Sequence, residues 1–116
     1  MGAVTFETLA FGKTAEEAFS KAIEDARNMH GHGGYTGTIA EKDTLEVIPE
    51  REHKGRQKRT VARELIEEGD ERIQSKRGPV GAINCSGTTE AKRYRERKGL
   101  KGKHGDVWLF FGWASR

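Results

Sequence analysis

The chain has little of several features that mark particular classes of protein. Its 116 residues include two prolines, two tryptophans, two tyrosines and one cysteine. A single cysteine, Cys85, excludes an intrachain disulfide framework and a zinc site built from several cysteines. No run of about 18 apolar residues occurs, so the sequence offers no membrane-spanning helix. The first residues, MGAVTFETLAFGK, lack a basic start and a long apolar stretch. We therefore expect no secretory signal and a cytoplasmic location.

Length and composition predict one small domain. Apolar residues make up 34% of the chain and charged residues another 34%, so the apolar share is low for a globular protein. A chain of 116 residues has room for one modest core, which excludes a large enzyme with a cleft between two domains. We expect a single domain over residues 1–116, with two basic excursions that are described next.

Positive charge is concentrated in two short segments, 51–59 (REHKGRQKR) and 90–104 (EAKRYRERKGLKGKH). Together they hold 12 basic and 3 acidic residues, a net charge of +9. The other 92 residues hold 9 basic and 15 acidic residues, a net charge of −6. An acidic body that carries two basic segments favours a polyanionic partner. The alternative interpretation is that both segments are solvated loops that keep the chain soluble.

The start of the chain predicts a strand followed by a helix. Residues 4–11 are rich in β-branched and aromatic residues, which is typical of a strand. Thr14 and Glu17 have the spacing of a capping box, in which each side chain can bond to the backbone N–H of the other. Apolar residues then recur on one helical face as far as Gly31, which predicts a helix over residues 15–30.

Shorter elements are predicted in the middle of the chain. Thr60 is expected to cap a short helix that ends at Gly69, and the segment 51–59 before it is expected to form a loop. The remaining predicted elements are strands over residues 35–40, 45–48 and 80–85 and helices over residues 61–68 and from Thr88 or Thr89 through Lys98.

The most apolar run lies near the C-terminus, at residues 107–113. If it is a strand, Trp108 and Phe110 lie on one face and four apolar residues lie on the other. Such a strand is either central and covered on both sides, or presents one face to a partner. We therefore expect a core strand here and keep open an oligomer formed through it.

The order of these elements predicts an α+β fold. We expect a mainly antiparallel sheet of four or five strands, with one long helix and one short helix packed on it. The long helix, 15–30, should cover one face of the sheet. The short helix, 61–68, should pack beside it or at an edge.

The basic segments give the clearest functional signal. Lys and Arg side chains can neutralise phosphates, and Tyr94 could stack on a base. The segments match no RRM, KH, zinc-finger or homeodomain pattern, so the signal is one of charge. The candidate nucleic-acid-binding residues are Arg56, Lys58, Arg59, Lys92, Arg93, Tyr94, Arg95, Arg97, Lys98, Lys101 and Lys103.

A glycine-rich turn with two histidines follows the first helix. Its candidate ligand-binding residues are His30, His32 and Tyr35, which could hold a metal or the phosphate of a small molecule. A helix precedes this turn and a strand is expected after it, which is the wrong order for a P-loop or a dinucleotide-binding fingerprint. A tight structural turn is the alternative interpretation, and no cofactor or metal is assigned.

No enzyme signature is visible. Cys85 could act as a nucleophile with a histidine base, but its surroundings match no nucleophile motif, and a lone cysteine on a short strand is more typical of a buried apolar residue. We therefore expect a non-enzymatic protein, with Cys/His or metal-dependent chemistry kept open.

Three stretches resemble small uncharacterised accessory proteins encoded by bacteriophages. They are residues 30–42 (HGHGGYTGTIAEK), 78–81 (GPVG) and 108–115 (WLFFGWAS), about a fifth of the chain. The resemblance implies a cytosolic accessory protein, made in an infected or lysogenic host cell, that acts by binding. It brings no catalytic residues, and the two basic segments are not part of it.

Three hypotheses for function follow. The first is a binding protein that contacts the nucleic-acid backbone, RNA or DNA, through its basic surface. The second is an inhibitor that binds a host or defence protein, either through the basic surface or because the acidic body imitates nucleic acid. The third is a protein that binds a phosphorylated small molecule or a metal at the glycine- and histidine-rich turn. No membrane partner is expected.

Overall fold

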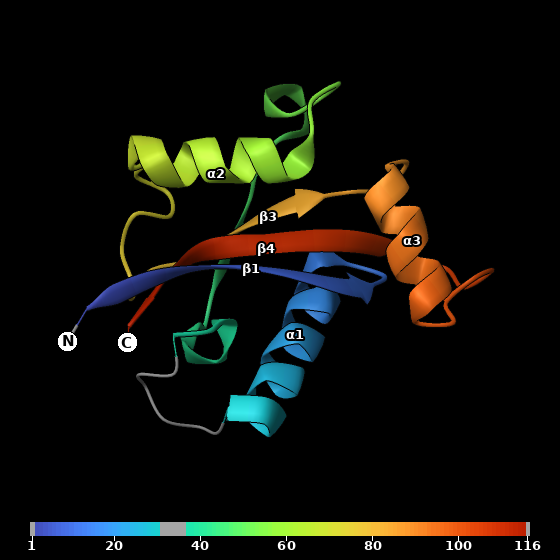
Figure 1. Ribbon diagram of the computed structural model, residues 1–116, viewed down its shortest axis with the longest axis horizontal. Coiled ribbons are helices and arrows are strands. Elements are labelled where there is room, and N and C mark those ends of the chain that lie inside the picture. The colour runs from blue at the N-terminus through green and yellow to red at the C-terminus, as the bar shows by residue number, and fades with distance from the viewer. Residues whose placement is uncertain (1, 31–36, 116) are drawn as a thin grey trace.

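The protein is a three-layer α+β structure, seen here in a computed structural model that describes residues 2–30 and 37–115. A four-stranded sheet forms the middle layer, with strands in the order β1-β4-β3-β2. Helix α1 (Ala15–His30) lies on one face of the sheet, and α2 (Lys58–Glu68) covers the other (Figure 1). Helix α3 (Thr89–Arg97) stands at one end of the sheet. The α+β class and a sheet of four strands were predicted and are confirmed.

The two ends of the chain form the longest pairing in the sheet. Strand β1 (Ala3–Gly12) runs antiparallel to β4 (Asp106–Ser115) over ten residues. Strand β3 (Val80–Asn84) is antiparallel to β4 on its other side, and β2 (Leu45–Val47) is parallel to β3. The sheet is therefore mixed, although two of its three pairings are antiparallel.

Strand β4 is central, and this explains its apolar sequence. Its residues Leu109 and Phe111 join the core cluster under α2, and Trp108 and Phe110 join the cluster under α1. All four are 9% exposed or less. Because β4 has a strand on each side and a helix on each face, the core of a single chain accounts for its apolar sequence, and the oligomer considered for residues 107–113 stays a prediction.

Helix α1 has the predicted bounds. Its Thr14 hydroxyl oxygen accepts a hydrogen bond from the Glu17 backbone N–H at 3.1 Å, as a capping box requires. The turn into the helix needs glycine at position 12, since a Cβ there would lie 2.5 Å from the Ala18 nitrogen. The Phe19 ring then packs on Phe110 at 5.7 Å between centroids, which holds α1 against the sheet.

The short helix lies elsewhere than expected. Helix α2 is on the sheet face opposite α1, not beside it or at an edge, because its apolar residues face the β4 side chains that α1 leaves uncovered. It also begins at Lys58, three residues before the predicted start. The Val61 N–H donates to the Gln57 carbonyl at 3.1 Å, so Thr60 lies inside the first turn and does not cap it. Gly69 ends the helix in a left-handed conformation, as predicted.

The basic segment 51–59 is also more regular than the expected loop, because it contains part of a 3-10 turn, η2 (Glu50–Glu52), and the first two residues of α2. The predicted strand over 35–40 is wrong where the structure describes it. Residues Ile39–Glu41 form another 3-10 turn, η1, since the Thr38 hydroxyl accepts from the Ala40 N–H. Residues 35 and 36 lie outside the described part of the chain.

The remaining predicted elements are confirmed within one or two residues. Strands β2 and β3 each end one residue earlier than expected. Thr88 caps α3, because its hydroxyl accepts from the Ala91 N–H at 3.1 Å and also donates to the Cys85 carbonyl at 2.7 Å. The same threonine thus fixes where β3 ends and where α3 begins.

Candidate functional site

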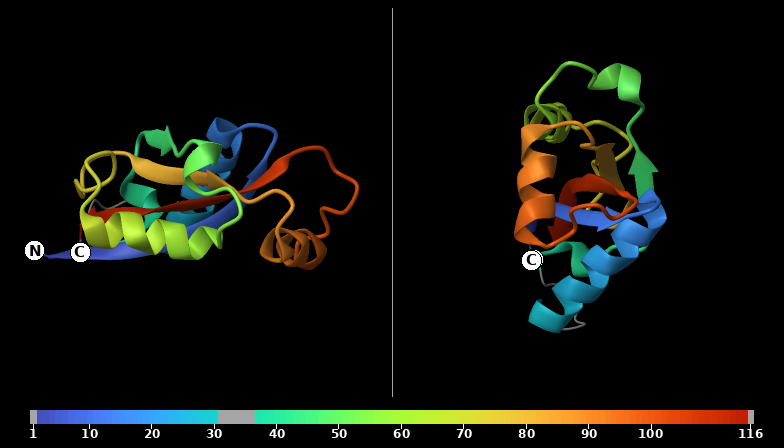
Figure 2. Two further views of the ribbon diagram at one scale, coloured as in Figure 1. Left: turned by 90° about the horizontal axis from the view of Figure 1, so that it is seen from above. Right: turned by 90° about the vertical axis from the view of Figure 1, so that its right-hand side faces the viewer.

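The two basic segments, far apart in sequence, meet at a groove between the start of α2 and helix α3. The groove has a volume of about 700 Å³. Residues 55–59 form one wall, and residues from α3 form the other. Figures 1 and 2 show the backbone of these two segments at the same end of the molecule. The charged residues that line it are the basic Arg56, Lys58, Arg59, Arg93 and Arg97 and the acidic Glu90.

The 55–59 wall is held by internal bonds. One Arg56 guanidinium nitrogen contacts both Glu64 carboxylate oxygens at 2.7 Å, and the Lys58 ammonium donates to the His53 carbonyl at 2.7 Å. The Arg59 guanidinium donates to Glu90 at 2.7 Å and to Glu7 at 2.8 Å. These three cations therefore bind the start of α2 to its surroundings; the charges of Arg56 and Arg59 are balanced by carboxylates, and Lys58 is held by a carbonyl.

Arg95 also has a structural role. Its guanidinium donates to the backbone carbonyls of Lys103 and Gly105, the latter at 3.0 Å. It also lies 5.0 Å from the centre of the Phe11 ring, within reach of a cation–π interaction. Arg95 thus fastens the loop after α3 to the body of the protein, which leaves it little freedom to contact a phosphate.

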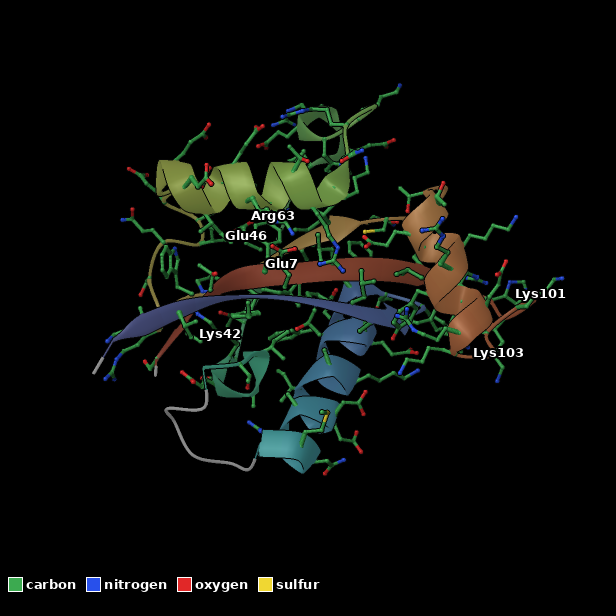
Figure 3. All side chains as sticks on the ribbon, in the orientation of Figure 1. Glu7, Lys42, Glu46, Arg63, Lys101 and Lys103 are labelled. Atoms are coloured by element: carbon green, nitrogen blue, oxygen red, sulfur yellow. The ribbon has the colours of Figure 1, made fainter. Side chains whose placement is uncertain are left out.

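Six of the predicted cations are different, and we name them the α3 basic surface. All six are exposed, and none forms an ion pair with a carboxylate in the described residues 2–30 and 37–115. Figure 3 shows two of them, Lys101 and Lys103, on the loop that projects beyond α3. The α3 basic surface consists of Lys92, Arg93, Arg97, Lys98, Lys101 and Lys103.

A second hollow, of about 650 Å³, lies on the other side of α3, against the 99–105 loop. Lys92 and Lys101 line it together with the turn at 86–88. Asp106 stabilises that turn, because its carboxylate accepts from the Ser86 hydroxyl at 2.6 Å. The α3 basic surface therefore lies between two hollows.

Tyr94 is packed into the protein. Its ring is half-buried against the core cluster under α2, and burial raises the pKa of its hydroxyl. The Arg97 guanidinium and the Lys98 ammonium lie 5.4 Å and 5.9 Å from the ring centre. This packing favours an anchoring role for Tyr94 over the base stacking that the sequence suggested.

The glycine- and histidine-rich turn falls largely outside the described residues. His32 and Tyr35 lie there, and His30 is described only as the last residue of α1. Among the residues that are described, no group of three or more His, Cys, Asp or Glu side chains could hold a metal ion. The third hypothesis therefore stays a prediction.

Cys85 lacks the environment of a nucleophile. It is 1% exposed, and burial raises the pKa of its thiol to about 12. Its sulfur lies 3.6 Å from the Ile83 carbonyl oxygen. The thiol is therefore protonated at neutral pH and acts as a small core residue.

Sequence reasoning missed two charged residues that hold elements together, Glu7 beside the groove and Lys42 away from it (Figure 3). Glu7 is a lone acid in an apolar strand, and its carboxylate bridges Arg59 and Arg63 from β1 to α2 (Figure 3). Lys42 is 2% exposed, and its ammonium donates to the Lys76 and Gly78 carbonyls, both at 3.0 Å. The only sequence signal for Glu7 was a charge at a strand position that should face the core. No sequence signal marked Lys42.

The chain matches no known family model, no curated protein and no solved structure at a significant level. None of the described helices is both long and apolar enough to cross a membrane.

Proposed function

We propose that the protein binds the sugar–phosphate backbone of nucleic acid through the α3 basic surface, without strong sequence selectivity. The observation that carries this proposal is the availability of charge. Six exposed cations lie on one helix and its following loop, and no described carboxylate pairs with them. Such cations can replace the condensed counterions of a phosphate backbone without first breaking an internal ion pair.

The groove beside α3 adds to the same electrostatic field. The first turns of α2 and α3 both border it, and helix N-termini carry partial positive charge. No acid lies in the first turn of α2, and its N-cap residue, Gln57, makes no side-chain cap. The backbone N–H groups at the start of α2 are therefore not offset by a local carboxylate on that helix.

Backbone contact is favoured over base reading for a chemical reason. The α3 basic surface consists of Lys and Arg only, and the one aromatic residue among the candidates, Tyr94, packs against the core. Sequence-selective single-strand binding usually needs exposed aromatic rings on which bases can stack. We therefore expect binding that depends on salt much more than on sequence.

Fluorescence anisotropy of labelled single- and double-stranded oligonucleotides, over a series of salt concentrations, tests the proposal. The double variant Arg93→Ala/Arg97→Ala should weaken binding about tenfold and reduce the log–log salt slope by roughly two for duplex DNA. The matched control, Arg27→Ala/Arg77→Ala, removes the same charge from exposed positions away from α3 and should bind like wild type.

Two outcomes would overturn the proposal. One is no binding even at low salt, which would make the basic segments solubility features and direct attention to a protein partner. The other is an equal loss of affinity in both double variants, which would mean that only the net charge matters and that the α3 basic surface is not a site.

A further inference from the structure

Strand β1 has a long free edge. It is ten residues long, it is the outermost strand, and it pairs with β4 on one side only. The left-hand view of Figure 2 shows β1 along one border of the sheet, with β4 next to it. Within the described residues, no strand lies on its other side. An edge of this kind offers a row of backbone hydrogen-bonding groups to another strand.

The hydrogen bonds of β4 show which groups of β1 face outward. The Ser115 N–H donates to the Glu41 carboxylate, and the Ser115 carbonyl accepts from the Gly37 N–H, both at 2.8 Å. Ser115 therefore makes no bonds to Ala3, the residue opposite it. The N–H and C=O groups of Ala3 therefore point away from β4. Hydrogen-bonded and non-bonded residue pairs alternate along an antiparallel ladder, so every second residue of β1 points outward in the same way. The outward N–H and C=O groups consequently belong to the odd-numbered residues Ala3, Thr5, Glu7 and Leu9.

The opposite end of the ladder agrees with this assignment. The Val107 carbonyl accepts from the Cys85 N–H at 2.8 Å, so Val107 faces β3. Its partner on β1 is Phe11, another odd-numbered residue.

This edge lacks the features that usually prevent strand pairing. Residues 3–12 contain no lysine and no proline, and their register with β4 runs without a bulge. The one charge, Glu7, is held on the α2 face by Arg59 and Arg63. The edge is therefore open to a second strand from Ala3 to Leu9, where the groove beside α3 begins, and residues 10–12 are buried.

We propose that a second copy of this chain pairs with β1, antiparallel, with the two-fold axis at Phe6. This register makes the two Phe6 residues a non-bonded pair, where Cβ atoms approach most closely, while each ring stays packed over Gly112 of its own β4. Glu7 then lies opposite Thr5 of the partner subunit. An axis at Glu7 would place two like charges opposite each other, and an axis at Thr8 would place Glu7 opposite an apolar leucine.

The pairing creates one continuous eight-stranded sheet with about eight new backbone hydrogen bonds, two for each bonded residue pair. A two-fold axis perpendicular to the sheet places both copies of α1 on one face of the joined sheet and both copies of α2 on the other. The two α3 basic surfaces then lie at opposite ends of the joined sheet, because α3 stands at one end of each sheet (Figure 1) and the paired β1 strands run antiparallel. This last consequence rests on the proposed function; the dimer itself does not.

A pair of cysteine variants tests the register directly. Phe6→Cys places two thiols opposite each other at a separation that a disulfide can span, and it should form a covalent dimer with oxidised glutathione. Thr8→Cys lies on the same face of β1 but faces Val4 of the partner subunit, so it should remain uncrosslinked. The native Cys85 is 1% exposed and does not compete.

Sedimentation velocity without nucleic acid tests the dimer, so its failure is separate from any failure of nucleic-acid binding. Wild type should sediment as a dimer in reversible equilibrium. Thr5→Pro should be monomeric, since it removes an outward N–H without breaking a bond to β4, and Thr5→Val should remain dimeric.

A wild type that is monomeric up to submillimolar concentration would overturn the proposal. So would a dimer in which Phe6→Cys does not crosslink, or crosslinks no better than Thr8→Cys. Circular dichroism reports whether Thr5→Pro folds. If it does not, the two cysteine variants still decide the question.

Discussion

The two basic segments have a similar density of charge in the sequence but very different surroundings in the fold. In 51–59, the side chains of Arg56, Lys58 and Arg59 bind carboxylates or a carbonyl of the protein. In 90–104, only Arg95 is used in this way, and six cations remain exposed without a described carboxylate partner. Charge counted along a sequence is therefore not the same as charge available to a partner. Availability depends on which acids the fold brings near.

This difference has a structural cause in β1. Glu7 lies at the middle of the strand on the α2 face, and it is placed so that Arg59 and Arg63 reach it from one helix. Helix α3 carries Glu90 and Glu96, but Glu90 pairs with Arg59, and Glu96 forms no ion pair with the exposed cations among the described residues. Three of the five cations of 51–59 thus stabilise the fold, whereas Arg51 and Lys54 are exposed and form no ion pair within residues 2–30 and 37–115. The α3 basic surface gathers six such cations for binding.

The largest expected effect comes from removing the available charge. The variant with Lys92, Arg93, Arg97 and Lys101 all replaced by Ala should bind duplex DNA about a hundredfold more weakly, because each lost phosphate contact costs roughly 0.7 kcal/mol. Anisotropy titration at moderate salt measures the affinity, and circular dichroism serves as the control for folding. A folded variant with affinity within threefold of wild type would remove the distinction between the two segments.

A smaller effect is expected in stability when a bound cation is removed. Arg59→Ala leaves Glu7 and Glu90 without their shared partner, and it should lower the free energy of unfolding by about 1–2 kcal/mol. Arg93→Ala, on the opposite wall of the same groove, should change it by less than about 0.5 kcal/mol. Urea unfolding of the two variants measures the contrast. Equal losses would show that the ion pairs of Arg59 contribute nothing specific.

The smallest effect concerns pH. His53 is buried, its Nδ1 has no hydrogen-bond partner among the described residues, and burial together with the nearby Lys58 charge lowers the pKa of its ring. The unfolded chain therefore binds a proton more readily than the folded protein does. Stability should be complete above the unfolded pKa of about 6.5 and should decrease as the pH falls below it.

Urea unfolding between pH 7.5 and pH 5 measures this decrease, and His53→Gln is the matched variant. We expect His53→Gln to be less stable than wild type at neutral pH but to vary less over this range. A wild type and a variant with parallel pH profiles would contradict the assignment to His53.

Much of the fold could be predicted because its signals are local. The bounds of α1 follow from the Thr14 capping box and a regular apolar face, and the end of α2 follows from Gly69. The two-sided apolar pattern of residues 107–113 identified a central strand. Each of these features depends on residues within a few positions of one another.

The errors concern contacts between distant residues. Residues 39–41 have the composition of a strand, but the Thr38 side chain and Glu41, which accepts from the Gly37 and Ser115 N–H groups, stabilise a tight turn instead. The strand order and the face that α2 covers depend on the completed sheet. For the same reason, the sequence could indicate eleven candidate contact residues but not which of them the fold had already paired.

The most direct test of this account compares the two walls of the groove in one measurement. The salt dependence of binding to duplex DNA should be determined for Arg93→Ala/Arg97→Ala and for Arg56→Ala/Lys58→Ala, which remove the same charge. We expect the α3 variant to reduce the log–log slope by roughly two and the other variant to leave it within about half a unit of wild type. Equal reductions, or a larger one for Arg56→Ala/Lys58→Ala, would contradict it.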